Sequence, residues 1–264
     1  SFSDEGILIP FVDRFDSSKS IIKRASEFIF RKNVIKFYEK AMEEFKPDIV
    51  HLHIYYGFLS NSLISTIKKY DVRIIISVHE YRLLCPAYTM TRDRENNNCT
   101  LCANGNYFHN VLNRCTKKSL SYSLLSSLEC YMRDTFYDIY NNVDHFIMVS
   151  NFINSTHLDF RDTLKGKTSV LWNFTQEVKA VSKPSNKEYF LYVGRLSHEK
   201  GLDTLVQTFN DVNANLMIVG TGPEEERLRN DCAGSDNIKL LGFKSGNELA
   251  QLYAEAHFLI IPSE

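Results

Sequence analysis

The chain has 264 residues, and its 31 Lys and Arg nearly balance its 32 Asp and Glu. This balance argues against nucleic acid as a partner, because proteins that coat nucleic acid carry a large excess of positive charge. A hydrophobic fraction of 44% is too high for a disordered chain, and no apolar run reaches the roughly 18–20 residues that cross a bilayer. The composition therefore predicts a cytoplasmic globular protein with one large or two modest domains.

Segments typical of strands and helices alternate along most of the chain, which predicts an α/β fold with parallel sheets. In the first part we expect a helix over 21–45, a strand over 48–54, a helix over 62–70, a strand over 73–79, a helix over 120–140, and strands over 145–150 and 168–172. The segment 175–188 is polar and holds Pro184. We expect it to link a domain over 1–174 to a second domain over 189–264.

The second domain has a regular βα rhythm, with strands expected over 189–194, 215–220, 237–242 and 257–262. The first three strands end on glycine, at Gly194, Gly220 and Gly242. Ser245 and Glu248 have capping-box spacing, which predicts the start of a helix. Because the carboxyl ends of parallel strands meet at one edge of a sheet, three terminal glycines predict a ligand cleft there.

The loop after the first of these strands carries two positive charges, Arg195 and Lys200. A glycine lets a ligand approach the backbone closely, and the following helix N-terminus favours an anion. The pattern therefore predicts binding of a diphosphate, and the alternative is two solvated charges beside a turn. For Gly220 and Gly222, a phosphate contact and a structural tight turn are both open.

Taken together, these motifs resemble the donor domain of family-four glycosyltransferases of the GT-B fold. The matching segments are 192–201, 218–223 and 237–242, closed by Pro262 and Ser263. In the first domain, segments 46–53 and 77–86 resemble the acceptor domain of members that assemble bacterial surface polysaccharides such as capsule or lipopolysaccharide. The resemblance covers residues 37–264.

The resemblance implies two Rossmann-like domains facing across a cleft, with acceptor binding in 1–174 and donor binding in 189–264. It implies a retaining transfer of a sugar from a UDP- or GDP-linked donor to a polysaccharide or lipid-linked acceptor, without a catalytic metal. The implied donor-site residues are Gly194, Arg195, Lys200, Gly220 and Gly222, with Gly242, Phe243 and Lys244 near the base. His79 is the implied catalytic residue that approaches the reacting sugar. The alternative is that His79 is a structural histidine at a strand end, with its hydrogen bonds made within the fold.

The chain departs from the family pattern at both ends. Nothing before Ile21 reads as the usual first βα unit, and the chain stops at Glu264, before the family's paired glutamates. We therefore expect a truncated protein whose second domain is cut after its fourth strand, with weak or no activity alone. Two alternatives remain: a non-catalytic remnant that binds a nucleotide or a partner, and a nucleotide-sugar epimerase of related architecture.

Four cysteines are concentrated in the long loop 85–115, at positions Cys85, Cys99, Cys102 and Cys115. A Cys-x2-Cys pair flanked by two further cysteines predicts a structural zinc site, and free thiols or disulfides are the alternatives. Separately, basic residues along 21–40 predict peripheral contact with the inner face of a membrane, where lipid-linked acceptors lie. The alternative for that helix is an apolar stripe that packs in the core.

Overall fold

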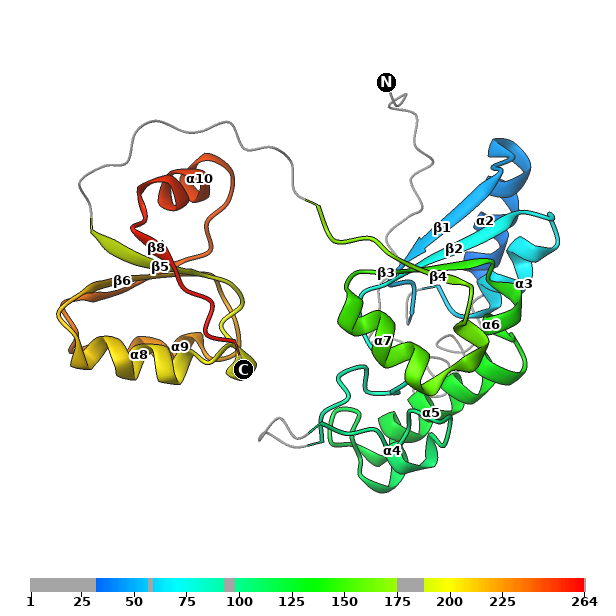
Figure 1. Ribbon diagram of the computed structural model, residues 1–264, viewed down its shortest axis with the longest axis horizontal. Helices are drawn as coiled ribbons and strands as arrows, with labels where there is room; N and C mark the ends of the chain where they lie inside the picture. Colours follow the sequence, from blue (N-terminus) through cyan, green and yellow to red (C-terminus); the bar gives the residue numbers. More distant parts are fainter. Residues whose placement is uncertain (1–31, 57–58, 93–97, 175–187, 264) are drawn as a thin grey trace. The chain divides into compact units, whose positions relative to one another are not determined.

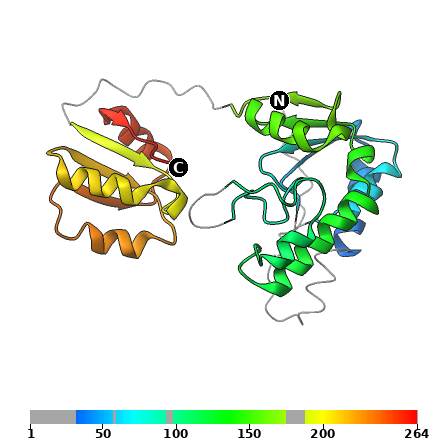
Figure 2. The ribbon, with the colours of Figure 1, turned by 60° about the horizontal axis from the view of Figure 1, so that its bottom comes forward.

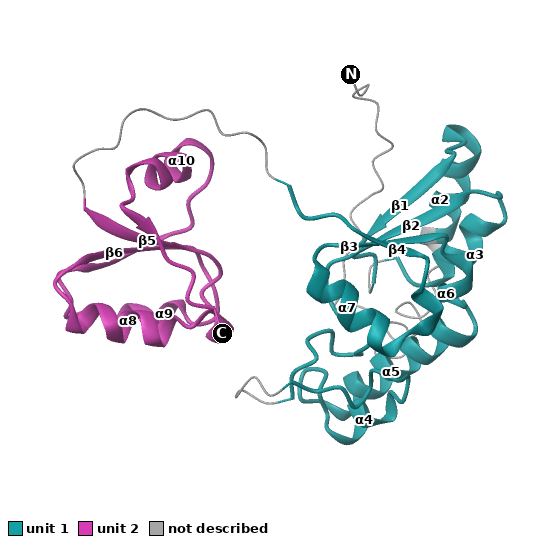
Figure 3. Cartoon of the chain, in the orientation of Figure 1, with its two compact units in different colours: residues 1–174 teal, residues 175–264 magenta. Residues whose placement is uncertain are grey.

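The computed structural model describes residues 32–56, 59–92, 98–174 and 188–263. The chain divides into two compact units, Ser1–Phe174 and Thr175–Glu264 (Figure 3). Each unit contains a four-stranded sheet in which every pairing is parallel. The predicted α/β class is confirmed, and both units are Rossmann-like. The linker expected over 175–188 lies almost wholly outside the described residues.

The sheet of unit 1 has its strands in sequence order, β1 (Ile49–His53), β2 (Arg73–Val78), β3 (His145–Met148) and β4 (Thr168–Val170). Its helical segments are α2 (Lys32–Phe45), α3 (Ser62–Lys68), α4 (Phe108–Leu112), α5 (Leu120–Thr135), α6 (Ile139–Asn142), α7 (Asn151–Phe160) and the 3₁₀ turn η1 (Asp162–Leu164) (Figure 1). All four strands predicted for this part form, with slightly narrower bounds.

The core of unit 1 lies on one face of this sheet. Ile74, Ile76 and Phe146 are fully buried there, against Ile64 and Ile67 of α3. These strand residues alternate in sequence with those of the opposite face, since side chains of a strand point to the two faces in turn. That opposite face carries the histidines considered below.

Two predicted helices differ from the structure, and two further helices were not predicted. The apolar stripe predicted a core helix over 21–45, but residues 21–31 lie outside the described part and Phe45 at the end of α2 is 72% exposed. The helix predicted over 120–140 is interrupted because Asp138 takes a left-handed conformation, with φ of 41°, between α5 and α6. The helices α4 and α7 were not predicted.

Unit 2 contains β5 (Tyr189–Val193), β6 (Asn215–Val219), β7 (Ile238–Gly242) and β8 (Phe258–Leu259), arranged in the order β7-β6-β5-β8. Its helices are η2 (His198–Lys200), α8 (Leu202–Asp211), α9 (Glu225–Asp231) and α10 (Gly246–Glu255). Figures 1 and 2 show α8 and α9 on one side of the sheet and α10 on the other. The four strands predicted here all form.

Both faces of the unit 2 sheet are packed. Leu216 and Ile218 pack with apolar residues of α8, whereas Leu191 and Val219 pack with Leu249 on α10. This two-sided burial explains the nearly continuous apolar sequence of the central strands. It also holds the carboxyl ends of three strands at one edge, where the loops begin.

The capping box predicted at the start of α10 does not form. The helix begins after Ser245, as expected, but the Ser245 side chain makes no capping hydrogen bond. Glu248 instead forms an ion pair with Lys244, at 3.4 Å between Nζ and Oε1. The Ser245–Glu248 spacing therefore predicted the start of the helix correctly, but not the capping hydrogen bonds.

Candidate functional site

Backbone hydrogen bonds connect the loops at the carboxyl ends of β5, β6 and β7. The Gly194 N–H donates to the Val219 carbonyl at 3.0 Å, and the Gly220 N–H donates to the Gly242 carbonyl at 2.9 Å. The Leu196 N–H donates to the Thr221 carbonyl at 3.0 Å. The predicted edge is therefore built by direct contact between the loops, which fixes where each loop residue projects.

The glycines of these loops serve different purposes. A Cβ at Gly220 would overlap the Gly194 carbonyl, and a Cβ at Gly222 would overlap the Leu196 carbonyl. The space next to both glycines is thus filled by the chain's own backbone, so close loop packing explains them. Gly242, whose φ is +69°, has no atom within 4 Å of the place that a Cβ would take.

Arg195 and Lys200 project from the loop after β5. Arg195 is exposed and Lys200 is half-buried, and neither has an ion pair or side-chain hydrogen bond within the described residues. Between them in sequence, Glu199 accepts a hydrogen bond from the Ser197 hydroxyl at 2.6 Å. This bond lowers the pKa of Glu199, and Lys200 and Arg195 lower it further. Both cations therefore act on the same small region, and both are available to an anion.

The residues expected near the base follow β7. Phe243 is 71% exposed, and Lys244 is partly covered and engaged with Glu248. An exposed aromatic ring at this edge offers a flat surface for stacking. Lys244 is less available than Arg195 because its charge already has a partner.

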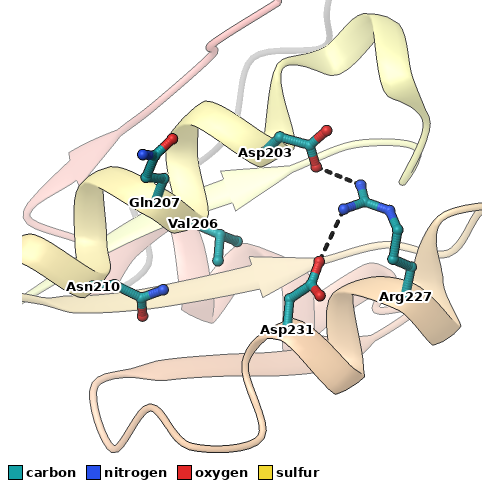
Figure 4. A pocket seen from close by; sticks show the side chains of 6 residues that line it. All are labelled: Asp203, Val206, Gln207, Asn210, Arg227 and Asp231. Carbon is teal, nitrogen blue, oxygen red and sulfur yellow. Dashed lines mark hydrogen bonds and ion pairs between the residues drawn. The ribbon is translucent and has the colours of Figure 1, made fainter.

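A hollow of about 220 Å³ lies between α8 and α9 (Figure 4). Arg227 crosses it, donating to Asp203 and, at 2.9 Å, to Asp231, and it also pairs with Glu224. None of the predicted donor-site residues lines this hollow. Because Arg227 is held by three carboxylates, the hollow does not present a free cation to a phosphate.

In unit 1, His79 follows the end of β2 and belongs to a row of histidines. His79 Nε2 lies 3.1 Å from His53 Nδ1 on β1, within hydrogen-bond distance. The His53 ring is 4.2 Å from the His51 ring, measured between centroids, and His51 Nε2 lies 2.9 Å from the Ser77 hydroxyl. The sequence reasoning missed His51 and His53. The alternation His-x-His on a strand that pairs with β2 was the available signal.

The environment lowers the pKa of two of these histidines, His51 and His79. Burial lowers the pKa of His79, and the nearby His53 lowers it further. Burial also lowers the pKa of His51, with contributions from His53 and His79. The contact with His53 occupies Nε2 of His79, so His79 keeps its other ring nitrogen for a further partner.

Comparison with known families matches both units. Residues 18–175 match Glycosyltransferase Family 4, and residues 173–264 match Glycosyl transferases group 1. The chain belongs to glycosyltransferase family 4. This membership confirms the family that the motifs resemble, and it disfavours the epimerase alternative.

Curated relatives of this family-four chain are longer than it is. An uncharacterized glycosyltransferase of Methanocaldococcus jannaschii is 29% identical over 124 residues, covering 46% of this chain and 34% of the relative. A glycogen synthase of Flavobacterium johnsoniae is 25% identical over 267 residues, covering 82% of this chain and 52% of the relative. The chain thus spans about half or less of the length of these relatives.

A solved structure shares the fold of this chain. The Anabaena protein HepE, solved in complex with UDP, aligns with a TM-score of 0.51 and 13% identity, covering 87% of this chain and 56% of that chain. At this identity the likeness concerns the fold alone. It agrees with the GT-B-type assignment of the two units.

The four loop cysteines of this family-four chain gather in one region. Burial raises the pKa of the Cys102 thiol to about 12, and Cys85, Cys115 and Cys99 each add to the shift because they are close. All four are free thiols. However, no group of three or more His, Cys, Asp or Glu side chains in the described residues is arranged to hold a metal ion. These side-chain positions do not by themselves make the predicted four-cysteine ligand set, so the structural zinc site stays a prediction beside its alternatives.

Proposed function

We propose that this chain carries the donor-diphosphate site of a retaining glycosyltransferase that moves a sugar from a UDP-linked donor to a hydroxyl of a polysaccharide or lipid-linked acceptor. The observation that carries this proposal is a pair of cations on the loop after β5, Arg195 and Lys200, neither of which has an ion pair or side-chain hydrogen bond within the described residues. Family membership supports the reaction class. The UDP bound by the Anabaena relative supports the choice of uridine among the donor bases.

The loop provides what a leaving diphosphate needs. As the bond from the sugar to the diphosphate breaks, negative charge builds on the phosphate oxygens. The Arg195 guanidinium can donate two parallel hydrogen bonds to such oxygens, while the Lys200 ammonium acts as a compact charge. The loop contacts around Gly194 and Gly220 hold the backbone that carries both residues, so little reorganisation is needed when charge develops.

Two further residues have proposed roles, Phe243 in unit 2 and His79 in unit 1. We assign Phe243 to the base, because its exposed ring stands beyond β7 at the same edge as Gly194. We assign His79 to the reacting sugar, where a neutral imidazole can exchange a hydrogen bond with a sugar hydroxyl. Its bond to His53 would fix the orientation of the ring. Gly194 and Gly242 would let the donor approach the backbone closely.

The test is calorimetric titration of this chain with UDP, GDP and ADP. We expect saturable binding of UDP, and Arg195→Ala and Lys200→Ala should each weaken it by about 1.5–3 kcal/mol, the range for hydrogen bonds to charged groups. Lys239→Ala is the matched control, because Lys239 is an exposed cation on β7 of the same unit. If all three variants bind UDP as tightly as the parent chain, the diphosphate assignment is wrong.

Transfer is measured separately, with a radiolabelled UDP-sugar and a lipid-linked or polysaccharide acceptor. Transfer with the anomeric configuration preserved would support the proposal in full. UDP binding without transfer would instead support the alternative of a chain that binds nucleotide without turnover. Preference for GDP would retain the diphosphate role of Arg195 and Lys200 but refute the choice of base.

The structural zinc remains a prediction from the cysteine spacing. It is supported by the gathering of the four thiols, but it requires their side chains to turn towards a common point. Metal analysis of protein purified without chelator should then give close to one zinc per chain. A Cys99→Ser variant that retains the full metal content would contradict the four-cysteine site.

A further inference from the structure

Helix α5 has its apolar side on the outside of unit 1. Leu120, Leu124, Leu128 and Tyr131 recur at spacings of four, four and three residues, so they line one face of the helix. They are 53%, 58%, 47% and 38% exposed, respectively. A surface helix of a globular protein normally turns such a stripe towards the core.

The buried face of α5 is polar instead. Ser123, Ser126, Ser127, Glu129 and Arg133 are all nearly inaccessible. The Asn110 amide, from α4, donates to the Ser123 carbonyl at 2.8 Å and lies within hydrogen-bond distance of the two other serines. Polar contacts therefore attach α5 to the unit, and the part of unit 1 that the structure describes leaves the leucine face exposed.

Helix α4 extends this apolar surface. It packs beside α5, and Figures 1 and 2 show the two helices as neighbours in both views. Phe108 and Leu112 are 56% and 62% exposed, and the Phe108 N–H donates to the Tyr131 hydroxyl at 3.2 Å. We call this surface the α4–α5 apolar face; it comprises Phe108, Leu112, Leu120, Leu124, Leu128 and Tyr131.

Within segment 106–136, which the structure describes in full, the exposed charges beside the α4–α5 apolar face are basic. Arg114, Lys117 and Lys118 lie in the turn between the two helices, and all three are exposed. Lys117 also stands over the Tyr122 ring, at 4.5 Å from its centroid. The two acidic residues of segment 106–136 are covered and held in ion pairs with arginines: Glu129 with Arg82, and Asp134 with Arg133 and Arg161.

An apolar helix face with a basic border matches the chemistry of an anionic lipid surface. Leucine and aromatic side chains enter the boundary between headgroups and acyl chains, and Lys and Arg contact lipid phosphates. The helix α2, predicted from sequence to make such contact, is less suited in its described part because exposed Glu43 and Glu44 accompany Lys36 and Lys40. No helix in the described residues is long and apolar enough to cross a bilayer.

We propose that the α4–α5 apolar face docks this protein on an anionic lipid surface. The face is separate from the Arg195 loop, so the proposal does not depend on the donor assignment. It would place unit 1 where a lipid-linked acceptor is anchored. The basic border favours a membrane over a second copy of the chain, since two copies meeting through this face would bring their basic borders together.

Vesicle sedimentation tests the proposal with the chain as it stands. We expect binding to phosphatidylcholine vesicles that contain about one third phosphatidylglycerol, and much weaker binding to phosphatidylcholine alone. The double variant Lys117→Gln/Lys118→Gln should bind about 25-fold more weakly, since each basic residue near the surface contributes about fivefold. Leu124→Ser/Leu128→Ser should bind at least about tenfold more weakly.

A matched control is the double variant Phe37→Ser/Phe45→Ser, which removes two exposed aromatic side chains from α2. It should bind vesicles as the parent chain does. Absent vesicle binding, or equal loss in the α2 and α5 variants, would overturn the proposal. If the parent chain dimerises but does not bind vesicles, and Leu124→Ser/Leu128→Ser abolishes the dimer, the face is a protein interface instead. UDP titration of the same variants should be unaffected, so failure here is distinguishable from failure of the proposed function.

Discussion

Acid should destabilise unit 1 through one buried histidine, His157 on α7. The side chain is 0% exposed, and its Nδ1 lies 2.8 Å from the Ile153 carbonyl, so Nδ1 must donate. Its Nε2 has no hydrogen-bond partner within the described residues. A proton added at Nε2 would therefore be buried without an acceptor, next to the stacked Tyr81 ring and close to Arg161 and Arg133.

The size of the effect follows from the pKa. Burial is the largest of the effects that lower the pKa of His157 from 6.5 to about 4; the hydrogen bond to Ile153 opposes it, and Arg161 and Arg133 add to it. A depressed histidine pKa means that the unfolded chain takes up a proton first as the pH falls. The contribution of His157 to the free energy of unfolding is thus complete above about pH 6.5. It declines towards about pH 4, by about 3 kcal/mol in total at 1.36 kcal/mol per pKa unit. That is a large fraction of the 5–15 kcal/mol typical of a domain.

The assay is urea unfolding followed by far-UV circular dichroism at about pH 7.5 and about pH 4.5. The parent chain should lose about 2.5 kcal/mol more between these conditions than His157→Gln, which cannot titrate. Effects of acid elsewhere, including those at His51 and His79, are common to both proteins and cancel. His145→Gln serves as the control, because it removes a half-buried histidine of the same unit. Equal losses for the parent chain and His157→Gln would refute the reasoning.

Two further predictions concern packing. Gly220→Ala should lower the free energy of unfolding by more than about 1 kcal/mol and weaken UDP binding, because the new Cβ would overlap the Gly194 carbonyl. The measurement is thermal unfolding, with Gly234→Ala as the control, because no atom lies within 4 Å of the place that a Cβ would take at Gly234. Arg82→Met should lower the free energy of unfolding by about 3–5 kcal/mol in urea titrations, because it removes the 2.6 Å ion pair of the buried Glu129. An unchanged midpoint in either variant would contradict the corresponding argument.

Local signals in the sequence located the elements and the loop that carries Arg195 and Lys200. Runs such as 73–78 and 189–193 are rich in β-branched and aromatic residues, and they form strands because such side chains suit the pleated backbone. Strands alternating with helices require parallel pairing, so the α/β class followed as well. Arg195 and Lys200 were found because a strand, a glycine and a helix start lie together in one short segment.

The histidine row could be recognised only from strand pairing. His53 and His79 are 26 residues apart, and they meet because the parallel register sets His53 opposite Ser77. Nothing within either segment specifies that register. Likewise, only the tertiary structure shows that the Gly194 carbonyl fills the space beside Gly220, so close packing of the loops requires a glycine there.

Helix α5 shows most clearly what the sequence by itself does not determine. Its 3.6-residue periodicity determines that Leu124 and Leu128 share a face, and that Ser126 and Arg133 share another. Periodicity does not determine which face is buried, and hydrophobicity alone predicts that the leucine face is buried. In the tertiary structure, the Asn110 amide donates a hydrogen bond to the Ser126 hydroxyl. Arg133 donates hydrogen bonds to the carbonyl groups of residues 82 and 83, so the polar face is inside. Only partners brought from distant segments could decide this, because a buried polar group is tolerated only where its hydrogen bonds are made.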